Sequence, residues 1–452
     1  MCRQSITAML LPLLLGLCMK VQAYSVLSHE ALIDAAWEMG IRPLLAKRFP
    51  NVTDDEIRQA HGFAYGGSII QDIGYYPHGS HFFSDLLHYV RGGDFIIAMI
   101  RDSQDLNEYA FALGALAHYA ADNNGHRIAV NLAVPMLYPK LQKKYSNVVT
   151  YEDDPTAHLR AEFGFDVLEV AKERYASDAY RNFIGFGVSK ELLERAFQDE
   201  YSLPLRAVFT DFDRAVGSYR YSVRTLIPEA TRIAWQIKKD EIQHDVPGTT
   251  LRKFQYNLSH ASFEKEWGKN YDQPSAWDKF LAFVIRVTPK IGPLKVLAFQ
   301  TPTPQMERMF MESFNVALAE YRRLLVEVKE DRLNLLNRNF DTGSPVQPGT
   351  YFMQDDAYGR LLHLLAKDQF RQISPALRSD ILSYFAALHF PANIKRDKKE
   401  KTRVDWKKVP EEIKQLQVAQ PEPTRAQTSD LSCCEMVRSE LCSSEESLQD
   451  LN

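Results

Sequence analysis

The chain has 452 residues, a formal net charge of -4, and 45% hydrophobic and 25% charged residues. These values are ordinary for a globular protein, and the length allows one large domain or two smaller ones. The slightly negative charge argues against a protein that holds nucleic acid mainly through a basic surface, although an enzyme that binds phosphate through metals stays open. The region 24–427 contains no cysteine, so its fold is expected to rest on a hydrophobic core rather than on disulfides.

The first 23 residues have the pattern of an export signal. Arg3 supplies the positive charge, an apolar run follows at 6–19, and the small residue Ala23 ends an acceptable cleavage site. That apolar run is too short for a comfortable membrane span. We therefore expect an exported protein, secreted or periplasmic, with Tyr24 as its first residue after cleavage.

The first part of the chain is expected to be helical, because helix-start signals recur and strand-like alternation is scarce. Ser28 is expected to cap a first helix, and Thr53 with Glu56 forms a capping box for a second. Asp105 opens a third helix, and Pro155 suits the first turn of a fourth. The predicted fold class is all-α, with polar side chains from facing helices and loops projecting into one cleft.

The rest of the chain is expected to contain further helices, at 190–198, 214–243, 304–329 and 355–366. The apolar, aromatic segment 277–299 fits either an interfacial lipid contact or a segment packed on the core. The connection 341–349 is rich in turn residues and carries no chemical signal. We predict a leader at 1–23, a catalytic domain at 24–245, a helical C-terminal region at 246–394 and a charged, disordered tail at 395–452.

The most informative pattern is a set of histidines and acids at metal-ligand spacing. His118 and Asp122 are four residues apart, as are His158 and Glu162, so each pair shares one face of a helix. His126 follows the first pair after one more helical turn. Imidazole nitrogens and carboxylate oxygens are the ligands that zinc accepts when thiolates are absent. A single such pair is common as a surface contact, but two pairs together predict a metal site.

Further candidate ligands precede these pairs. Asp72 and His88 extend the set toward the N-terminus. If the leader is removed, the α-amine of Tyr24 can bind a metal once it is deprotonated, and His29 lies five residues away. The amine, its carbonyl and this imidazole would form a separate site that depends on cleavage of the leader.

In this order, the residues resemble the zinc-dependent phospholipase C family and the related single-strand nucleases with three zinc ions. The resemblance covers roughly residues 24–171 and implies a multi-helix phospholipase C/nuclease-like domain, here followed by a helical C-terminal extension. The ligands that it implies are Asp72, His88, His118 and Asp122 for the first zinc, His126, His158 and Glu162 for the second, and Tyr24 and His29, with Asp122 bridging, for the third. The family usually begins with tryptophan where this chain has Tyr24, but because backbone atoms bind there, the difference concerns only the cleavage point.

The resemblance also implies an activity. It suggests an exported zinc-dependent phosphodiesterase that hydrolyses phospholipids at a membrane surface, through attack of a metal-activated hydroxide on phosphorus. Zinc lowers the pKa of water from about 15.7 to about 7, and Asp72 is the candidate for orienting or deprotonating that water. Two alternatives stay open: a zinc nuclease specific for single-stranded nucleic acid, and a non-catalytic metal-binding protein of the same fold.

Aromatic residues and histidines around positions 72–89 are candidates for contact with the substrate. These residues are Tyr75, Tyr76, Tyr89, His78 and His81. Tyr89 follows His88 directly and would be the base-stacking residue of the nuclease alternative. The sequence identifies no protein partner.

Overall fold

The computed structural model describes residues 26–171, 187–221, 240, 243–244, 299–388 and 404–419. Within these ranges the chain forms helices and no strand, apart from an isolated bridge between Arg338 and Pro345. The predicted all-α fold class is therefore confirmed. The expected leader, Tyr24 and nearly all of the segment 277–299 lie outside the described residues.

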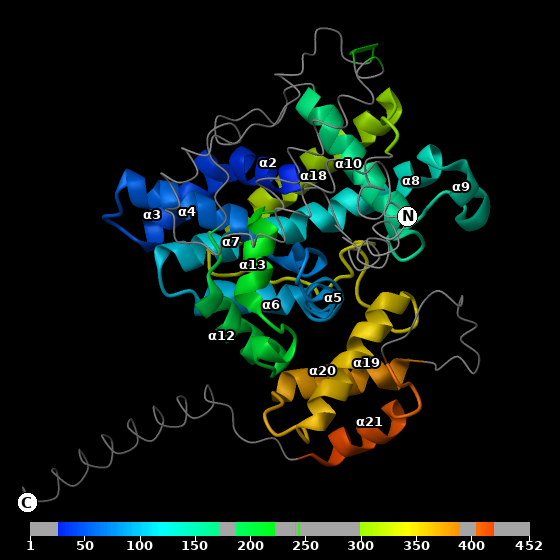
Figure 1. Cartoon of the computed structure of the whole chain (residues 1–452). Coiled ribbons are helices and arrows are strands. Elements are labelled where there is room, and N and C mark those ends of the chain that lie inside the picture. The colour runs from blue at the N-terminus through cyan, green and yellow to red at the C-terminus, as the bar shows by residue number, and fades with distance from the viewer. Residues whose placement is uncertain are drawn as a thin grey trace, which may run out of the picture.

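The helices are distributed along the whole described chain (Figure 1). In the first part they are α2 (Val26–Ala36), η1 (Trp37–Ile41), α3 (Arg42–Arg48), α4 (Asp54–Gly67), η2 (Ile70–Tyr75), α5 (His81–Tyr89), α6 (Gly92–Asp102), α7 (Leu106–Gly125), η3 (His126–Val130), α8 (Asn131–Leu137), α9 (Pro139–Tyr145) and α10 (Pro155–Ala171). Later in the chain they are α12 (Lys190–Tyr201), η4 (Leu205–Ala207), α13 (Phe212–Tyr221), α18 (Pro304–Lys329), α19 (Phe352–Lys367), α20 (Pro375–Ala387) and α21 (Val409–Val418).

Helix α7 is the centre of the core, because every residue from Glu108 to Gly125 is buried. Helices α4 and α18 both pack against it. The crossing of α4 and α7 needs glycine: a Cβ atom at Gly67 would lie 1.9 Å from the carbonyl oxygen of Phe111, and one at Gly114 would lie 2.1 Å from that of Ala64. Small residues thus bring two backbones close together and fix the position of α7.

Three predicted helix starts are confirmed and one is wrong. Helix α10 begins at Pro155, as predicted. The Thr53 side chain accepts a hydrogen bond from the Glu56 backbone amide in a capping box, and Asp105 accepts in the same way from Glu108. Ser28, in contrast, lies inside α2 rather than at its start. Its hydroxyl donates to Asp166 Oδ1 at 2.9 Å and thereby joins α2 to α10. A long-range bond therefore replaces the expected local cap.

The region beyond residue 245 shares the core of the first part. Helix α18 packs against α7, α2 and η3, and Tyr321 of α18 donates a hydrogen bond to the Leu113 carbonyl of α7. Helices α19, α20 and α21 lie together at the lower right of Figure 1. Helix α19 joins this group to the rest, since it packs on α5 and its Arg360 pairs with Asp85 at 3.1 Å. Described residues on both sides of residue 245 therefore belong to one hydrophobic core, and the domain boundary itself stays a prediction.

Part of the predicted disordered tail is ordered. Residues 409–418 form helix α21, in which Val409 and Leu416 are buried. The helix packs on α19 and α20, and Arg378 of α20 donates to the Leu416 carbonyl at 3.1 Å. The expectation of disorder is thus wrong for residues 404–419. Val409 and Leu416 are seven residues apart, so they share one face of α21, and both are buried.

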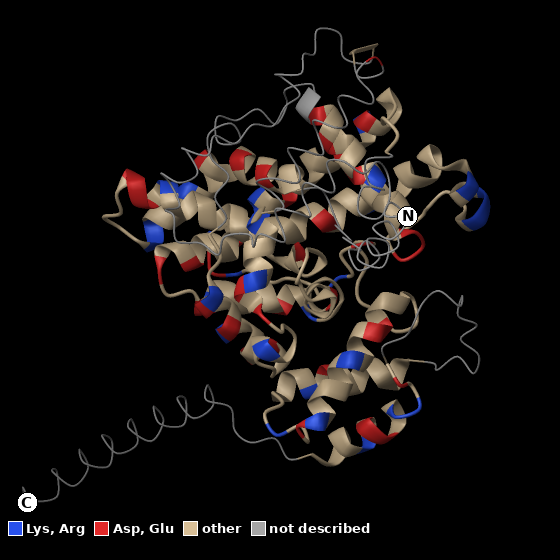
Figure 2. Ribbon diagram, in the orientation of Figure 1, with Lys and Arg blue, Asp and Glu red and all other residues tan. Residues whose placement is uncertain are grey.

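Charged side chains of both signs are interspersed over the helices (Figure 2). A short basic run on α9 contains Lys140, Lys143 and Lys144, all exposed. In the described part of the chain, no helix is both long enough and apolar enough to cross a bilayer. The mixed surface agrees with the nearly balanced charge of the whole chain.

Candidate metal centre

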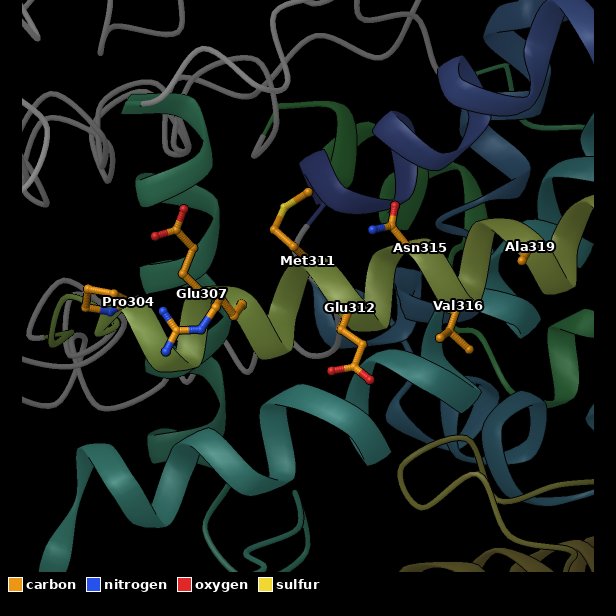
Figure 3. Close-up of a pocket in the computed structure, with 8 residues that line it drawn as sticks. Pro304, Glu307, Met311, Glu312, Asn315, Val316 and Ala319 are labelled. Carbon is orange, nitrogen blue, oxygen red and sulfur yellow. The ribbon is translucent and has the colours of Figure 1, made fainter.

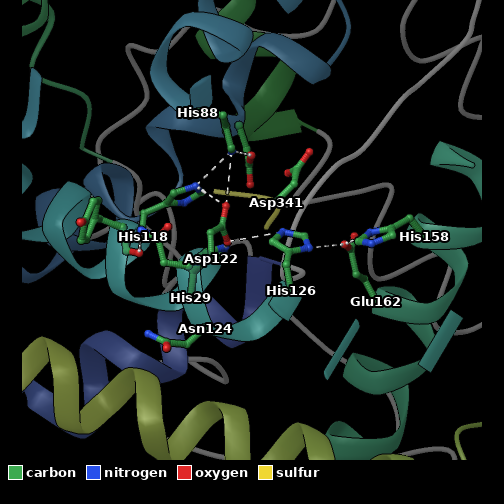
Figure 4. Close-up of polar contacts among 12 residues, drawn as sticks. His29, His88, His118, Asp122, Asn124, His126, His158, Glu162 and Asp341 are labelled. Carbon is green, nitrogen blue, oxygen red and sulfur yellow. Dashed lines mark hydrogen bonds and ion pairs between the residues drawn. The ribbon is translucent and has the colours of Figure 1, made fainter. Parts of the chain in front are cut away.

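Nearly all the predicted ligands meet at the centre of the molecule (Figure 4). Helix α7 brings His118 and Asp122, one turn apart, and His126 begins η3 directly after it. The other ligands come from neighbouring elements: His29 from α2, Asp72 from η2, His88 from the last turn of α5, and His158 and Glu162 from α10. All of these side chains are buried. Tyr24 lies outside the described residues, so its predicted place beside His29 stays a prediction.

The predicted ligands fall into three groups in which the candidate ligand atoms lie within 4.8 Å of one another. The groups are Asp72, His88 and His118; His126, His158 and Glu162; and His29, His118 and Asp122. His118 belongs to two of them, so the groups are neighbours rather than separate sites.

The atoms of the first group have the spacing of a zinc coordination shell. His88 Nε2 lies 3.3 Å from Asp72 Oδ1, 3.4 Å from Asp122 Oδ2 and 3.4 Å from His118 Nε2. His118 Nε2 lies 2.9 Å from Asp122 Oδ2. A tetrahedral zinc with bonds of about 2.0–2.1 Å holds its ligand atoms about 3.3 Å apart. The distances from His88 Nε2 to Asp72, Asp122 and His118 therefore match the separation between the ligand atoms of a zinc ion.

The other two groups are somewhat wider. His158 Nδ1 lies 2.9 Å from Glu162 Oε1, and His126 Nδ1 lies 3.9 Å from the same oxygen. His29 Nε2 lies 3.5 Å from Asp122 Oδ1, and the His29 ring stacks on that of His118 at 4.4 Å. Asp122 faces both groups, because its Oδ1 is also 3.9 Å from His126 Nε2. This carboxylate is thus the common member of the whole cluster.

Hydrogen bonds behind the histidines select the ring nitrogen that faces the cluster. His88 Nδ1 lies 2.8 Å from the Ser84 carbonyl, and His118 Nδ1 lies 2.9 Å from the Ser68 carbonyl. A carbonyl only accepts, so each Nδ1 carries a hydrogen and each Nε2 is the nitrogen left to bind a metal. Metal-binding histidines are typically held in this way.

The electrostatics of the metal-free cluster are unbalanced. Burial raises the pKa of Asp72 and raises that of Glu162 well above its usual value. Burial also raises the pKa of Asp122, but the His118 imidazole and hydrogen bonds from His118 and His88 outweigh it and hold this pKa well below its usual range. Burial lowers the pKa of His88, but hydrogen bonds to Asp122 and Asp72 raise it well above 6.5. Without a metal ion, the cluster therefore favours bound protons, which reduce the negative charge that metal cations would otherwise neutralise.

The surroundings of His126 give the clearest indication that the cluster binds a cation. Neither of its ring nitrogens has a hydrogen-bond partner within the described part of the chain, although the side chain is fully buried. A buried polar atom without a partner costs about 1–3 kcal/mol, so such an atom calls for an explanation. A cation beside His126, His158 and Glu162 would provide it. The donor set, its burial and its spacing therefore fit zinc.

The candidate substrate contacts have different surroundings. Tyr75 borders the cluster, with its ring 5.9 Å from that of His88, and His81 touches Tyr75 at 5.4 Å. Tyr76 packs edge-on against Tyr219 at 4.7 Å. His78 is exposed and has a positive φ of 64°. Contact of these residues with a substrate stays a prediction.

Tyr89 is fully buried and its hydroxyl donates to Asp341 Oδ2 at 2.7 Å. A ring in this position has no exposed face on which a base could stack. Asp341 itself was missed by sequence reasoning, since the connection 341–349 was expected to carry no chemistry. Figure 4 shows it beside the ligand cluster. Only the turn residues around it were visible in the sequence, and they say nothing of where the turn docks.

A surface groove lies along α18, away from the ligand cluster (Figure 3). Its walls include Pro304, Met311, Val316 and Ala319, together with Glu307 and Glu312. None of the candidate ligands lines it, and it offers no imidazole. The groove therefore has no part in the metal centre.

Comparison with known proteins agrees with this geometry. Residues 28–211 match the family model described as zinc dependent phospholipase C. The resemblance to this family is thus confirmed over the part of the chain that contains every described candidate ligand. No curated protein and no solved structure gave a match.

Proposed function

We propose that this chain, which resembles zinc-dependent phospholipase C over residues 28–211, is a zinc-dependent phosphodiester hydrolase that acts on phospholipids. The observation that carries the proposal is the buried cluster of three ligand groups joined through His118 and Asp122. A purely structural zinc site would need only one such group, closed by four protein ligands. Several adjoining groups instead suit a phosphate bound across more than one cation.

The charges of the cluster support an anionic substrate. Three zinc ions bring about six positive charges, whereas Asp72, Asp122 and Glu162 supply three negative ones. The surplus would attract a phosphodiester. Zinc, when bound, lowers the pKa of water to about 7 and stabilises negative charge on phosphate oxygens.

The protein's own residues would have separate tasks. Asp72 lies at the edge of the first group, with Oδ1 3.3 Å from His88 Nε2, and is our candidate for orienting or deprotonating the attacking water. Asp122 is the central carboxylate and would fix the positions of neighbouring ligand groups relative to one another. The Ser84 and Ser68 carbonyls keep His88 and His118 in the required tautomer.

Export and the third zinc form the finer part of the proposal. Cleavage of the leader after Ala23 would create an α-amine at Tyr24, only a short distance along the chain from His29. His29 already faces Asp122 from α2, so an amine arriving beside it would complete a third group. A secreted or periplasmic enzyme would thus acquire its full zinc content only after processing.

The test compares two substrates with mature, zinc-loaded protein: mixed phospholipid vesicles, followed by headgroup release, and single-stranded DNA. We expect faster phospholipid turnover that is lost on addition of a chelator and restored by zinc. Faster DNA cleavage would make the chain a nuclease, contrary to the burial of Tyr89. Full zinc content with no turnover of either substrate would favour the metal-binding alternative.

A further inference from the structure

A turn from the second half of the chain is inserted beside the ligand cluster. The Phe340 amide donates to the His88 carbonyl at 3.2 Å, and the Phe340 ring lies 5.4 Å from the His88 ring. The next residue, Asp341, is fully buried. This turn lies far beyond residue 211, where the family match ends. Residues outside the matched region therefore border the metal centre.

Asp341 is connected to His158 through one side chain, Asn131. The Asn131 amide nitrogen donates to the Asp341 backbone carbonyl at 2.7 Å. The Asn131 amide oxygen lies 2.8 Å from His158 Nε2. A carbonyl only accepts, so the amide nitrogen must face Asp341 and the amide oxygen must face His158. The Asp341 carbonyl thus decides which way the Asn131 amide points.

The orientation of the Asn131 amide in turn selects the tautomer of His158. An imidazole that binds a metal is neutral and carries one hydrogen. That hydrogen must lie on Nε2 to donate to Asn131. The lone pair of Nδ1 then faces Glu162 Oε1, 2.9 Å away. The ring is held with its ligand atom turned toward the second group, as a zinc site requires.

Asp341 is held firmly enough to serve as this anchor. Its Oδ2 accepts from the Tyr89 hydroxyl at 2.7 Å and from the Tyr351 hydroxyl at 2.5 Å. Its backbone amide donates to Asn339 Oδ1 at 3.1 Å. Gly343 closes the turn with a φ of +67°, and a Cβ atom there would lie 2.4 Å from the Asn123 carbonyl oxygen. Both the fold of the turn and its docking therefore fix the Asp341 carbonyl.

We propose that Asn131 and Asp341 form a positioning pair that holds His158 with Nδ1 toward the second metal group. The turn 337–345 thereby completes a zinc site whose ligands all come from the first half of the chain. Asn131 is a positioning residue rather than a ligand, because its two amide atoms are used by Asp341 and His158. The inference rests on the proposed zinc site. Its test distinguishes failure of the positioning pair from failure of the zinc site.

The test measures zinc content and zinc affinity by metal analysis and by competition with a chelator, in the full chain. Asn131→Leu removes both hydrogen bonds, and we expect one zinc of the complement to bind about 10–100-fold more weakly. Asn131→Asp keeps an acceptor for His158 Nε2 but cannot donate to the Asp341 carbonyl, so its affinity should lie between those of Asn131→Leu and the unaltered protein. Asn123→Leu is the matched control: Asn123 is buried nearby and its side-chain amide donates to the Tyr119 carbonyl, not to a candidate ligand, so zinc affinity should not change.

A second measurement reports the tautomer directly. In zinc-free protein labelled with ¹⁵N-histidine, magnetic resonance should show the His158 hydrogen on Nε2, and Asn131→Leu should mix the two tautomers. Unchanged zinc affinity in Asn131→Leu together with loss of one zinc in His158→Ala would overturn the positioning pair alone. If His158→Ala keeps all the zinc of the unaltered protein, the zinc site itself is wrong. If Asn131→Leu does not fold, Asn131→Asp and the tautomer of the unaltered protein decide the question.

Discussion

Asp122→Asn tests how much the buried charge of Asp122 stabilises the folded protein when no metal is bound. Asp122 is fully buried and has histidine nitrogens at 2.9, 3.4 and 3.5 Å, from His118, His88 and His29. The neutral amide removes the negative charge and leaves buried imidazolium groups without their partner. Breaking a buried pair in this way costs about 3–5 kcal/mol of unfolding free energy.

The cost should depend on pH in a definite direction. The lowered pKa of Asp122 contributes stability that is present above pH 3.8 and is lost as the pH falls through the folded pKa. The raised pKa values of His88 and His118 contribute stability that is fully present below pH 6.5 and is lost as the pH rises through their folded values. The interaction is therefore strongest between these limits, and Asp122→Asn should cost most near pH 6 and least at alkaline pH.

The assay is denaturant unfolding of zinc-stripped protein at about pH 6 and about pH 9. Asp213→Asn is a suitable control, since Asp213 is exposed and pairs with the surface residue Lys190, and its effect should stay within about 0.5 kcal/mol at both pH values. An equal cost of Asp122→Asn at the two pH values would refute the account, as would a cost below about 1 kcal/mol at pH 6.

Three further results are expected. Zinc loading at pH 7 should release protons, because the raised pKa values of His88 and His118 favour protonated imidazoles in metal-free protein. Calorimetry in buffers of different ionisation enthalpy would measure the release, and none at all would contradict it. By metal analysis, His118→Ala should lose about two zinc equivalents and Glu162→Ala about one, since His118 belongs to two ligand groups; equal losses would count against the grouping. Gly67→Ala should destabilise the protein by about 1–3 kcal/mol in thermal or denaturant unfolding, because the added Cβ would lie 1.9 Å from the Phe111 carbonyl oxygen. A stability equal to that of the unaltered protein would show that α4 shifts freely on α7.

The sequence could place most of the candidate ligands near one another because the pattern is local. His118 and Asp122 lie one helical turn apart, and so do His158 and Glu162, so the helix alone places each pair on one face. The all-α fold followed from capping signals such as that of Thr53, which depend on neighbouring residues only. The resemblance to a family then joined these local pieces in a common order.

Features that depend on distant contacts were not visible. Asp341 reaches the cluster because a turn docks on α5 and α8, and no property of the turn itself indicates that docking. Ser28 bonds to Asp166 across the core, although its type suggested a helix cap. Helix α21 gains its order from the surfaces of α19 and α20, which the composition of the tail does not reveal. Tertiary packing decided each of these cases.

The central claim is that the buried cluster holds zinc in three adjoining groups. Its most direct test is a crystal structure of the mature, zinc-loaded protein with anomalous scattering recorded at the zinc edge. We expect three anomalous peaks: one among Asp72, His88, His118 and Asp122, one among His126, His158 and Glu162, and one between His29 and Asp122. A map with no peak at any of these positions would contradict the account.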